Sequence, residues 1–173
     1  MVFRTLDDLG DIKGKRALVR VDLNVPMADG RVTDETRMRA LLPTVLELAD
    51  KGAKVLLLAH FGRPKGAKHS EMSVSMVLDA LQEVVGREIM FVPEVAGDVV
   101  AQSVGILADG DIALLENTRF WAGEEKNDPE LARAVAANGD LYVNDAFSAA
   151  HRAHMSTEGL AHILPAYAGR SME

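Results

Sequence analysis

Cysteine is absent from the 173 residues of this sequence, which excludes disulfides, zinc–thiolate sites and cysteine nucleophiles. Positive charge is scarce, because 19 Lys and Arg stand against 26 Asp and Glu, for a net charge of −7. General binders of nucleic acid or anionic membranes favour a basic surface, so neither partner is expected. No apolar run approaches the roughly 18 residues of a membrane span, and the amino-terminal residues lack the apolar stretch of a signal peptide. We therefore expect a cytoplasmic protein.

Several phosphate-binding and catalytic motifs are also missing. The sequence has no G-x-x-x-x-G-K-[ST] loop, no G-x-G-x-x-G after its first predicted strand, no H-E-x-x-H and no G-x-S-x-G elbow. The stretch "GRPKGAKHS" is rich in glycine and lysine but fails the P-loop spacing. The chain is thus expected to have no nucleotide-binding loop and no metal site of its own.

Short apolar segments alternate with longer helical patterns along the chain. Hydrophobic residues make up 48 % of it and charged residues 26 %, which is enough for a core in one domain. Strands are predicted at residues 16–21, 54–59, 88–92, 111–117 and 140–145, and helices at residues 34–52, 73–86, 98–107 and 128–139. This alternation predicts an α/β fold, a Rossmann-like parallel sheet flanked by helices on both faces, in a single domain.

Local signals mark several helix ends. Thr33 or Asp34 is a candidate cap for the helix of residues 34–52, inside which Pro43 predicts a kink or a later start. Ser73 and Asp128 are predicted caps of two other helices. The part from Ser156 onwards has a helical pattern that is interrupted by Pro165 and Gly169.

Polar side chains follow four of the predicted strands. In open parallel sheets ligands bind beyond the carboxyl ends of the strands. The residues there are Asp22 and Asn24; His60, Gly62 and Arg63; Glu116, Asn117 and Arg119; and Asn144, Asp145, His151, Arg152 and His154. Because arginine forks match phosphate or carboxylate oxygens, this edge is predicted to bind an anionic metabolite. Taken singly, Arg119 and Arg152 are equally well explained as surface ion pairs with Glu116 and Asp145.

Five motifs in this order resemble the phosphoglycerate kinase family. They are "RVDLNVP", "TRMRALLPT", "HFGRPKG", "LLENTRF" and "VNDAFSAAHRAHMST". The resemblance runs from about residue 3 to the last residue but covers only the amino-terminal half of that enzyme. It implies that residues 1–173 form the substrate-binding domain, and that the carboxyl-terminal, nucleotide-binding domain is absent from this sequence.

The resemblance also implies a role for individual residues. The implied ligand is 3-phosphoglycerate, with Asp22 and Asn24 against its backbone and hydroxyl and with its 3-phosphate among His60, Arg63, Arg119 and Arg152. Leu23, between Asp22 and Asn24, is also counted among the substrate-binding residues. Arg37 is implied to lie beside the reacting carboxylate as the catalytic arginine. Phe61 and Gly62 fall in the same binding loop, and Arg20 and His151 belong to a wider basic patch behind the contact residues.

The chemistry implied is reversible phosphoryl transfer between ATP and the carboxylate of 3-phosphoglycerate, giving 1,3-bisphosphoglycerate in glycolysis and gluconeogenesis. Mg and ATP or ADP are expected on the missing domain, which is the one protein partner expected of an otherwise monomeric chain. The fragment alone is expected to be inactive. Two positions depart from the commoner family pattern: Phe61 replaces Leu and is expected to turn into the core, and Ser148 replaces Gly in the loop before Arg152.

Two other functions are compatible with the same residues. The first is a stand-alone anion-binding module without catalysis. The second is a metal-dependent phosphatase, in which a strand ends in D-x-D; here "DLN" has Asn24 in place of the second acid, which disfavours it.

Overall fold

A computed structural model describes residues 4–173; residues 1–3, the first of the expected domain, lie outside the described part. Its main sheet has the strand order β5-β6-β4-β1-β7-β8. These strands are β5 (Ile89–Val92), β6 (Ile112–Leu115), β4 (Lys54–Leu58), β1 (Arg16–Arg20), β7 (Leu141–Asn144) and β8 (Ala166–Ala168). Every neighbouring pair runs parallel. The predicted parallel α/β fold is therefore confirmed.

Both faces of this sheet are buried. Leu18 and Val19 are adjacent in β1 and fully buried, yet they belong to two different hydrophobic clusters. Leu56 and Leu57 of β4 divide in the same way, because successive side chains of a strand point to opposite faces. The apolar strands of the sequence are continuous for this reason.

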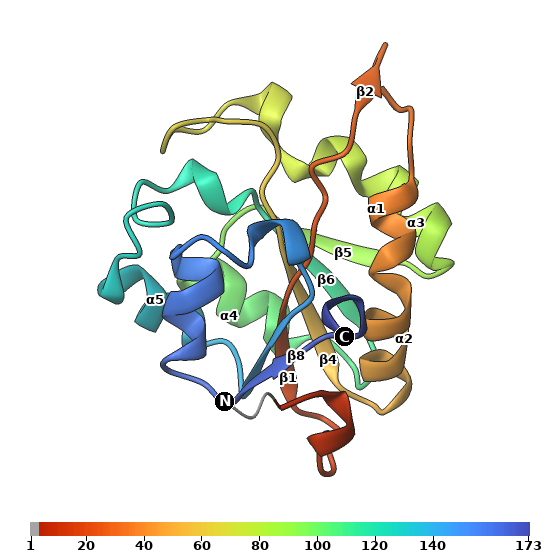
Figure 1. The fold of residues 1–173 in the computed structure, drawn as a ribbon, viewed down its shortest axis with the longest axis vertical. Helices are drawn as coiled ribbons and strands as arrows, with labels where there is room; N and C mark the ends of the chain where they lie inside the picture. Colours follow the sequence, from red (N-terminus) through yellow and green to blue (C-terminus); the bar gives the residue numbers. More distant parts are fainter. Residues whose placement is uncertain (1–3) are drawn as a thin grey trace.

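Five α-helices are found among residues 4–173, and they cover the two faces. They are α1 (Thr36–Ala40), α2 (Leu42–Asp50), α3 (Leu78–Val85), α4 (Asp98–Gly105) and α5 (Pro129–Ala136). Figure 1 shows α1, α2 and α3 on one side of the sheet and α4 and α5 on the other. Short 3₁₀ turns add η1 (Leu6–Asp8), η2 (Ser70–Met72), η3 (Val74–Val77), η4 (Thr118–Phe120), η5 (Phe147–Ala149) and η7 (Arg170–Met172), and η6 (Met155–Gly159) is a π-helical turn.

Two of the three predicted caps are present, whereas the cap predicted at Thr33 or Asp34 is wrong, because Glu35 precedes α1 and makes no side-chain cap bond. The Asp128 carboxylate accepts hydrogen bonds from the amides of Glu130 and Leu131 at the start of α5, where those amides have no partner within the helix. The Ser73 hydroxyl likewise accepts from the Ser75 amide, although the turn it opens is 3₁₀ (η3) before α3 begins. Among residues 4–173, no helix is both long enough and apolar enough to cross a membrane.

The predicted helix of residues 34–52 is two helices. The helix is interrupted at Leu41, which lies between α1 and α2. Pro43 lies in the first turn of α2, where a backbone N–H would have no partner within the helix, so its absence costs no hydrogen bond. The later helix start that Pro43 predicted is confirmed. The Asp34 carboxylate accepts from the Thr36 amide ahead of α1 at 2.9 Å.

Two features of the fold were not predicted. The carboxyl-terminal part is not interrupted helix throughout, because β8 follows Pro165 and pairs with β7 as a sixth strand. The three residues of β8 are partly exposed, so they lack the apolar run by which the other strands were recognised. The second feature is the hairpin of β2 (Met27–Ala28) and β3 (Arg31–Val32), whose Asp29-Gly30 turn has positive φ at both residues, as a two-residue type I′ turn requires.

The segment after β8 is attached to the end of β7. The Asp145 carboxylate accepts hydrogen bonds from the hydroxyls of Thr44 (2.9 Å) and Ser171 (2.8 Å), and burial raises the pKa of this carboxyl. Arg170 donates to both carboxylate oxygens of Glu47, at 3.0 Å each. A Cβ on Gly169 would overlap the Asp145 side chain.

We therefore expect Gly169→Ala to lower the free energy of unfolding by about 1–3 kcal/mol, the usual cost of overpacking. The backbone at Gly169 is extended, with φ of −74°, so the cost comes from the contact and not from strain. Gly105→Ala is the matched control, because no atom lies within 4 Å of a Cβ there and alanine favours a helix. Urea unfolding measures both variants, and equal urea midpoints for wild type and Gly169→Ala would contradict the expectation.

Candidate anion-binding site

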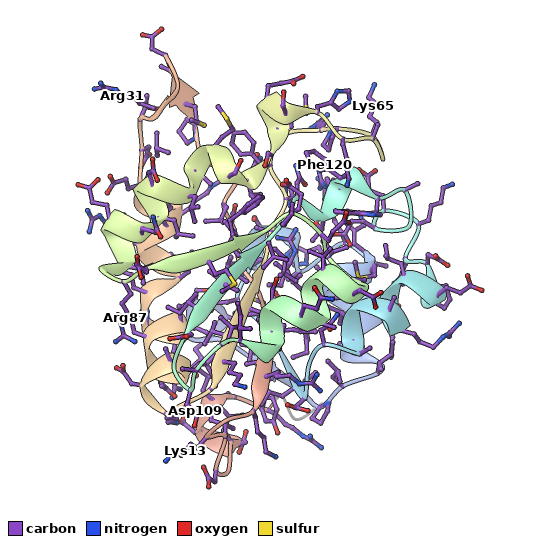
Figure 2. The ribbon with its side chains drawn as sticks, turned by 180° about the vertical axis from the view of Figure 1, so that it is seen from behind. Lys13, Arg31, Lys65, Arg87, Asp109 and Phe120 are labelled. Atoms are coloured by element: carbon purple, nitrogen blue, oxygen red, sulfur yellow. The ribbon has the colours of Figure 1, made fainter. Side chains whose placement is uncertain are left out.

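A pocket of about 280 Å³ lies between the loops that follow β1, β4 and β7. Helix α1, and the turn η4 that follows β6, complete its lining. The side chains and backbone that line it are those of Asp22, Asn24, Arg37, His60, Gly62, Arg63, Arg119, Ser148, Ala149 and Arg152. In Figure 2, Lys65 and Phe120, which follow β4 and β6, lie at one end of the molecule, and Lys13 and Asp109, which precede β1 and β6, lie at the other. The pocket is therefore at the carboxyl edge of the sheet, as predicted.

Size alone would not select this pocket. A larger hollow of about 520 Å³ lies beside β8 and is lined by residues such as Tyr142, Leu164 and Tyr167, with Arg4 as its one charged side chain among the described residues. Of the strand-end residues predicted for the site, it contains Asn144 but none of the arginines or histidines. Four arginines in one pocket of an acidic chain are the more specific sign of a ligand site.

Side-chain amides hold the strand-end loops together. The Asn24 Oδ1 atom accepts from the Gly62 amide at 3.0 Å, which joins the loop after β1 to the loop after β4. Asn117 donates from Nδ2 to the carbonyls of Phe61 (2.7 Å) and Met72 (2.8 Å). Gly62 has φ of +65°, a conformation that favours glycine. The backbone of the binding loop is thus fixed from both sides.

Arg37 reaches the pocket from α1. Its Nη1 donates to the Asn24 carbonyl at 2.7 Å and lies 3.6 Å from Asp22 Oδ1. About half of the Arg37 side chain remains exposed. The guanidinium is therefore positioned beside the β1 loop while retaining donors that can bind a ligand.

His60 and Arg119 form the buried part of the pocket. Burial, with the nearby charges of Arg20, Arg119 and Arg152, lowers the pKa of His60 to about 2, so its ring is neutral at physiological pH. Arg119 is only 7 % exposed, and burial lowers its pKa. Its Nε has no hydrogen-bond partner among residues 4–173, and Glu125 Oε1 lies 3.8 Å from it. A buried cation so weakly paired favours an incoming anion.

The alternative ion pairs considered for Arg119 and Arg152 are not formed within residues 4–173. The Glu116 carboxylate accepts from the Ser73 hydroxyl at 2.8 Å and from the Val74 amide at 3.1 Å, and so it anchors η3. Asp145 holds the carboxyl-terminal segment described above. Both acids therefore have structural partners, and the two arginines line the pocket.

Four predicted site residues do not line the pocket. Leu23 is fully buried in the core, and Phe61 packs against the same hydrophobic cluster, as expected. Arg20 is fully buried, with Nη2 2.6 Å from Nδ1 of His60. His151 is exposed and packs edge-on against Phe147, with 5.9 Å between ring centroids.

Ser148 and Ala149 line the pocket but were not predicted as site residues. The Ser148 hydroxyl donates to Asp22 Oδ2 at 2.7 Å, so the residue that replaces the commoner glycine connects the β7 loop to the β1 loop. Its position in the motif before Arg152 was the only signal in the sequence. No group of three or more His, Asp or Glu side chains within residues 4–173 is arranged to hold a metal ion.

A parallel α/β domain with a cationic pocket at the carboxyl ends of its strands is typical of a binding domain for a small anionic metabolite. The family model described as phosphoglycerate kinase matches residues 6–173. The chain belongs to the phosphoglycerate kinase family and corresponds to its amino-terminal portion.

Similar sequences and a similar solved structure are also phosphoglycerate kinases. The chain is 66 % identical over 173 residues to phosphoglycerate kinase of Zymomonas mobilis, covering all of this chain and 44 % of that protein. It is 64 % identical to that of Sphingopyxis alaskensis, covering 99 % of this chain and 43 % of the relative. The phosphoglycerate kinase structure from Pyrococcus horikoshii superposes with a TM-score of 0.87 at 33 % identity, over 99 % of this chain and 43 % of that one. The chain thus spans less than half of the length of these relatives.

The low pKa of His60 predicts acid sensitivity. The unfolded chain protonates this imidazole below pH about 6.5, whereas the folded chain does so only near pH 2. His60 therefore stabilises the fold fully above pH 6.5, and this contribution is lost as the pH falls from there toward 2, by at most about 1.4 kcal/mol per pH unit. We expect His60→Gln to show a shallower loss of unfolding free energy between pH 6.5 and 4 in urea titrations. Parallel curves for the two proteins would contradict this.

Proposed function

We propose that this chain is the 3-phosphoglycerate-binding part of a phosphoglycerate kinase. The observation that carries the proposal is the pocket at the carboxyl edge of the sheet, where four arginines and a neutral histidine converge in a chain of net charge −7. A ligand with a phosphate at one end and a carboxylate at the other suits such a pocket, because guanidinium forks bind both groups. Membership in the family supports the choice of ligand.

The two ends of the ligand are assigned to different sides of the pocket. His60, Arg63, Arg119 and Arg152 bind the phosphate in this proposal, since the buried Nε of Arg119 has no hydrogen-bond partner among residues 4–173 and the neutral His60 ring carries one N–H donor. The carboxylate lies toward Arg37, which is fixed to the β1 loop. Asp22 and Asn24 then contact the hydroxyl between the two ends.

The reaction proposed for the whole protein is phosphoryl transfer to the ligand carboxylate. A carboxylate is ionised at neutral pH, so no residue of this chain has to remove a proton. The task left to the chain is to position the nucleophile and to stabilise developing charge, which Arg37 can do. In this proposal the nucleotide and Mg bind the part of the relatives' length that this chain does not span.

Binding by the chain can be tested directly with 3-phosphoglycerate. We expect amide NMR signals near His60, Arg63, Arg119 and Arg152 to shift on titration, and the affinity to fall as salt is added, since exposed charges are screened. Arg63→Ala should weaken binding, whereas Arg39→Ala should not, because Arg39 pairs with Glu35 outside the pocket. Shifts that cluster at the opposite edge of the sheet would contradict the assignment.

The two kinds of arginine should differ in a full-length enzyme that contains this chain. Phosphate contacts are similar in the ground and transition states, so Arg63→Ala should mainly raise KM. Arg37→Ala should lower kcat by on the order of 10²-fold, as for other residues that stabilise developing charge. Steady-state kinetics at saturating substrate compares them, and a near-normal kcat for Arg37→Ala with a large kcat loss for Arg63→Ala would reverse the two roles.

A further inference from the structure

A buried chain of four side chains lies behind the pocket, and only its last member lines it. The Glu124 Oε2 atom accepts from the Ser156 hydroxyl at 2.6 Å. Ser156 Oγ accepts from Arg20 Nε at 2.9 Å, and Arg20 Nη2 lies 2.6 Å from His60 Nδ1. Glu124, Ser156 and Arg20 are completely buried. These three residues come from β1, from the segment after η4 and from η6, and His60 follows β4, so the four side chains connect four distant parts of the sequence.

Hydrogen-bond chemistry gives each link of this chain a direction. A guanidinium has donors only, so both Ser156 Oγ and His60 Nδ1 must accept from Arg20. The Ser156 hydroxyl proton is directed to the Glu124 carboxylate, which can only accept. Because Nδ1 of His60 accepts, the single proton of the neutral ring is on Nε2, on the ring edge away from Arg20. The contact with Arg20 uses Nδ1, which leaves Nε2 as the donor that the ring can offer to a ligand.

The charges around His60 support the same arrangement. Burial lowers the pKa of Arg20, yet a guanidinium stays charged in proteins, and its hydrogen-bond partners are Ser156 Oγ, the Val21 carbonyl and His60 Nδ1, none of them a carboxylate. Glu124, one hydroxyl group away, is the largest favourable charge acting on it. The charges of Arg119, Arg152 and His154 also act to lower the pKa of His60. A second proton on His60 would therefore place a donor against the Arg20 donor.

We propose that Arg20, Ser156 and Glu124 are positioning residues that hold His60 as a neutral Nε2–H donor to the anionic group of the ligand. The role as donor rests on the proposed function, but the position of the ring proton does not. None of the three residues lines the pocket, so they act only through His60. Glu124 and Ser156 lie outside the residues that the sequence analysis selected.

Two variants interrupt the chain, and one control leaves it intact. Ser156→Ala removes the link between Arg20 and Glu124, and Glu124→Gln removes the compensating charge at nearly constant shape. The control is Tyr142→Phe, because the Tyr142 hydroxyl donates to the backbone carbonyl of Ser156 at 2.7 Å. That change removes a buried hydrogen bond to the same residue but leaves the Arg20–His60 contact in place.

The measurement is the ¹⁵N NMR spectrum of the His60 ring in the whole chain, before and during titration with inorganic phosphate. In wild type we expect protonated Nε2 and unprotonated Nδ1 signals. Ser156→Ala and Glu124→Gln should move both nitrogen signals toward exchange between tautomers and weaken phosphate binding by roughly 2- to 10-fold, the loss of one hydrogen bond. Tyr142→Phe should lower the unfolding temperature without moving either signal or the affinity.

Three results would overturn the proposal. One is a wild-type ring with its proton on Nδ1, which needs no variant and decides the matter even if the variants fail to fold. Another is a pair of folded variants, Ser156→Ala and Glu124→Gln, whose ring signals match wild type. The third is Tyr142→Phe moving the signals as far as Ser156→Ala does. Phosphate that fails to bind while the Nε2–H tautomer is present would instead count against the proposed function.

Discussion

A parallel sheet that is covered on both faces can place polar chemistry only at its ends, and this constraint decides where everything else in the molecule lies. Leu18, Val19, Leu56 and Leu57 are buried on alternating faces, so no side chain in the middle of β1 or β4 can meet solvent. The first positions past each strand are therefore where a charged group can be held by a rigid framework and still contact a ligand. All lining residues of the pocket lie there or on α1.

The acidic chain places four arginines in the pocket and a fifth, Arg20, behind it, at a cost in solvation. Arg20 and Arg119 are buried, so their guanidinium groups lose the hydration that stabilises a charge in water. A desolvated charge must then be compensated within the protein. For Arg20, compensation comes from the buried Glu124 through the Ser156 hydroxyl. For Arg119 the closest carboxylate, Glu125, is 3.8 Å away and outside hydrogen-bond range. The stability of the fold and the affinity for a ligand therefore both depend on these buried charges.

The sequence was sufficient for what depends on local pattern, and insufficient for what depends on contacts across the sheet. Apolar runs and caps located the first five strands of the sheet and the capped starts of η3 and α5. Strand-end positions selected Asp22, His60, Arg63, Arg119 and Arg152. Arg37 came only from family resemblance, because its place beside Asn24 depends on how α1 packs. Ser148, Glu124 and Ser156 were missed, since their bonds connect residues 32 or more positions apart. β8 was missed because three partly exposed residues carry no strand signal.

The bonds that Asn24 and Asn117 make to the backbone of the β4 loop also bear on the entropy of binding. With Gly62 and Phe61 fixed before any ligand arrives, association does not have to order the main chain there. Arg63 and Arg152 remain exposed, so the ordering that binding demands falls on two long side chains, at about 0.5–1.5 kcal/mol each. The pocket therefore combines a rigid backbone with two exposed arginine side chains that can change rotamer. A ligand of a different shape would be accommodated by these side chains and not by the loop.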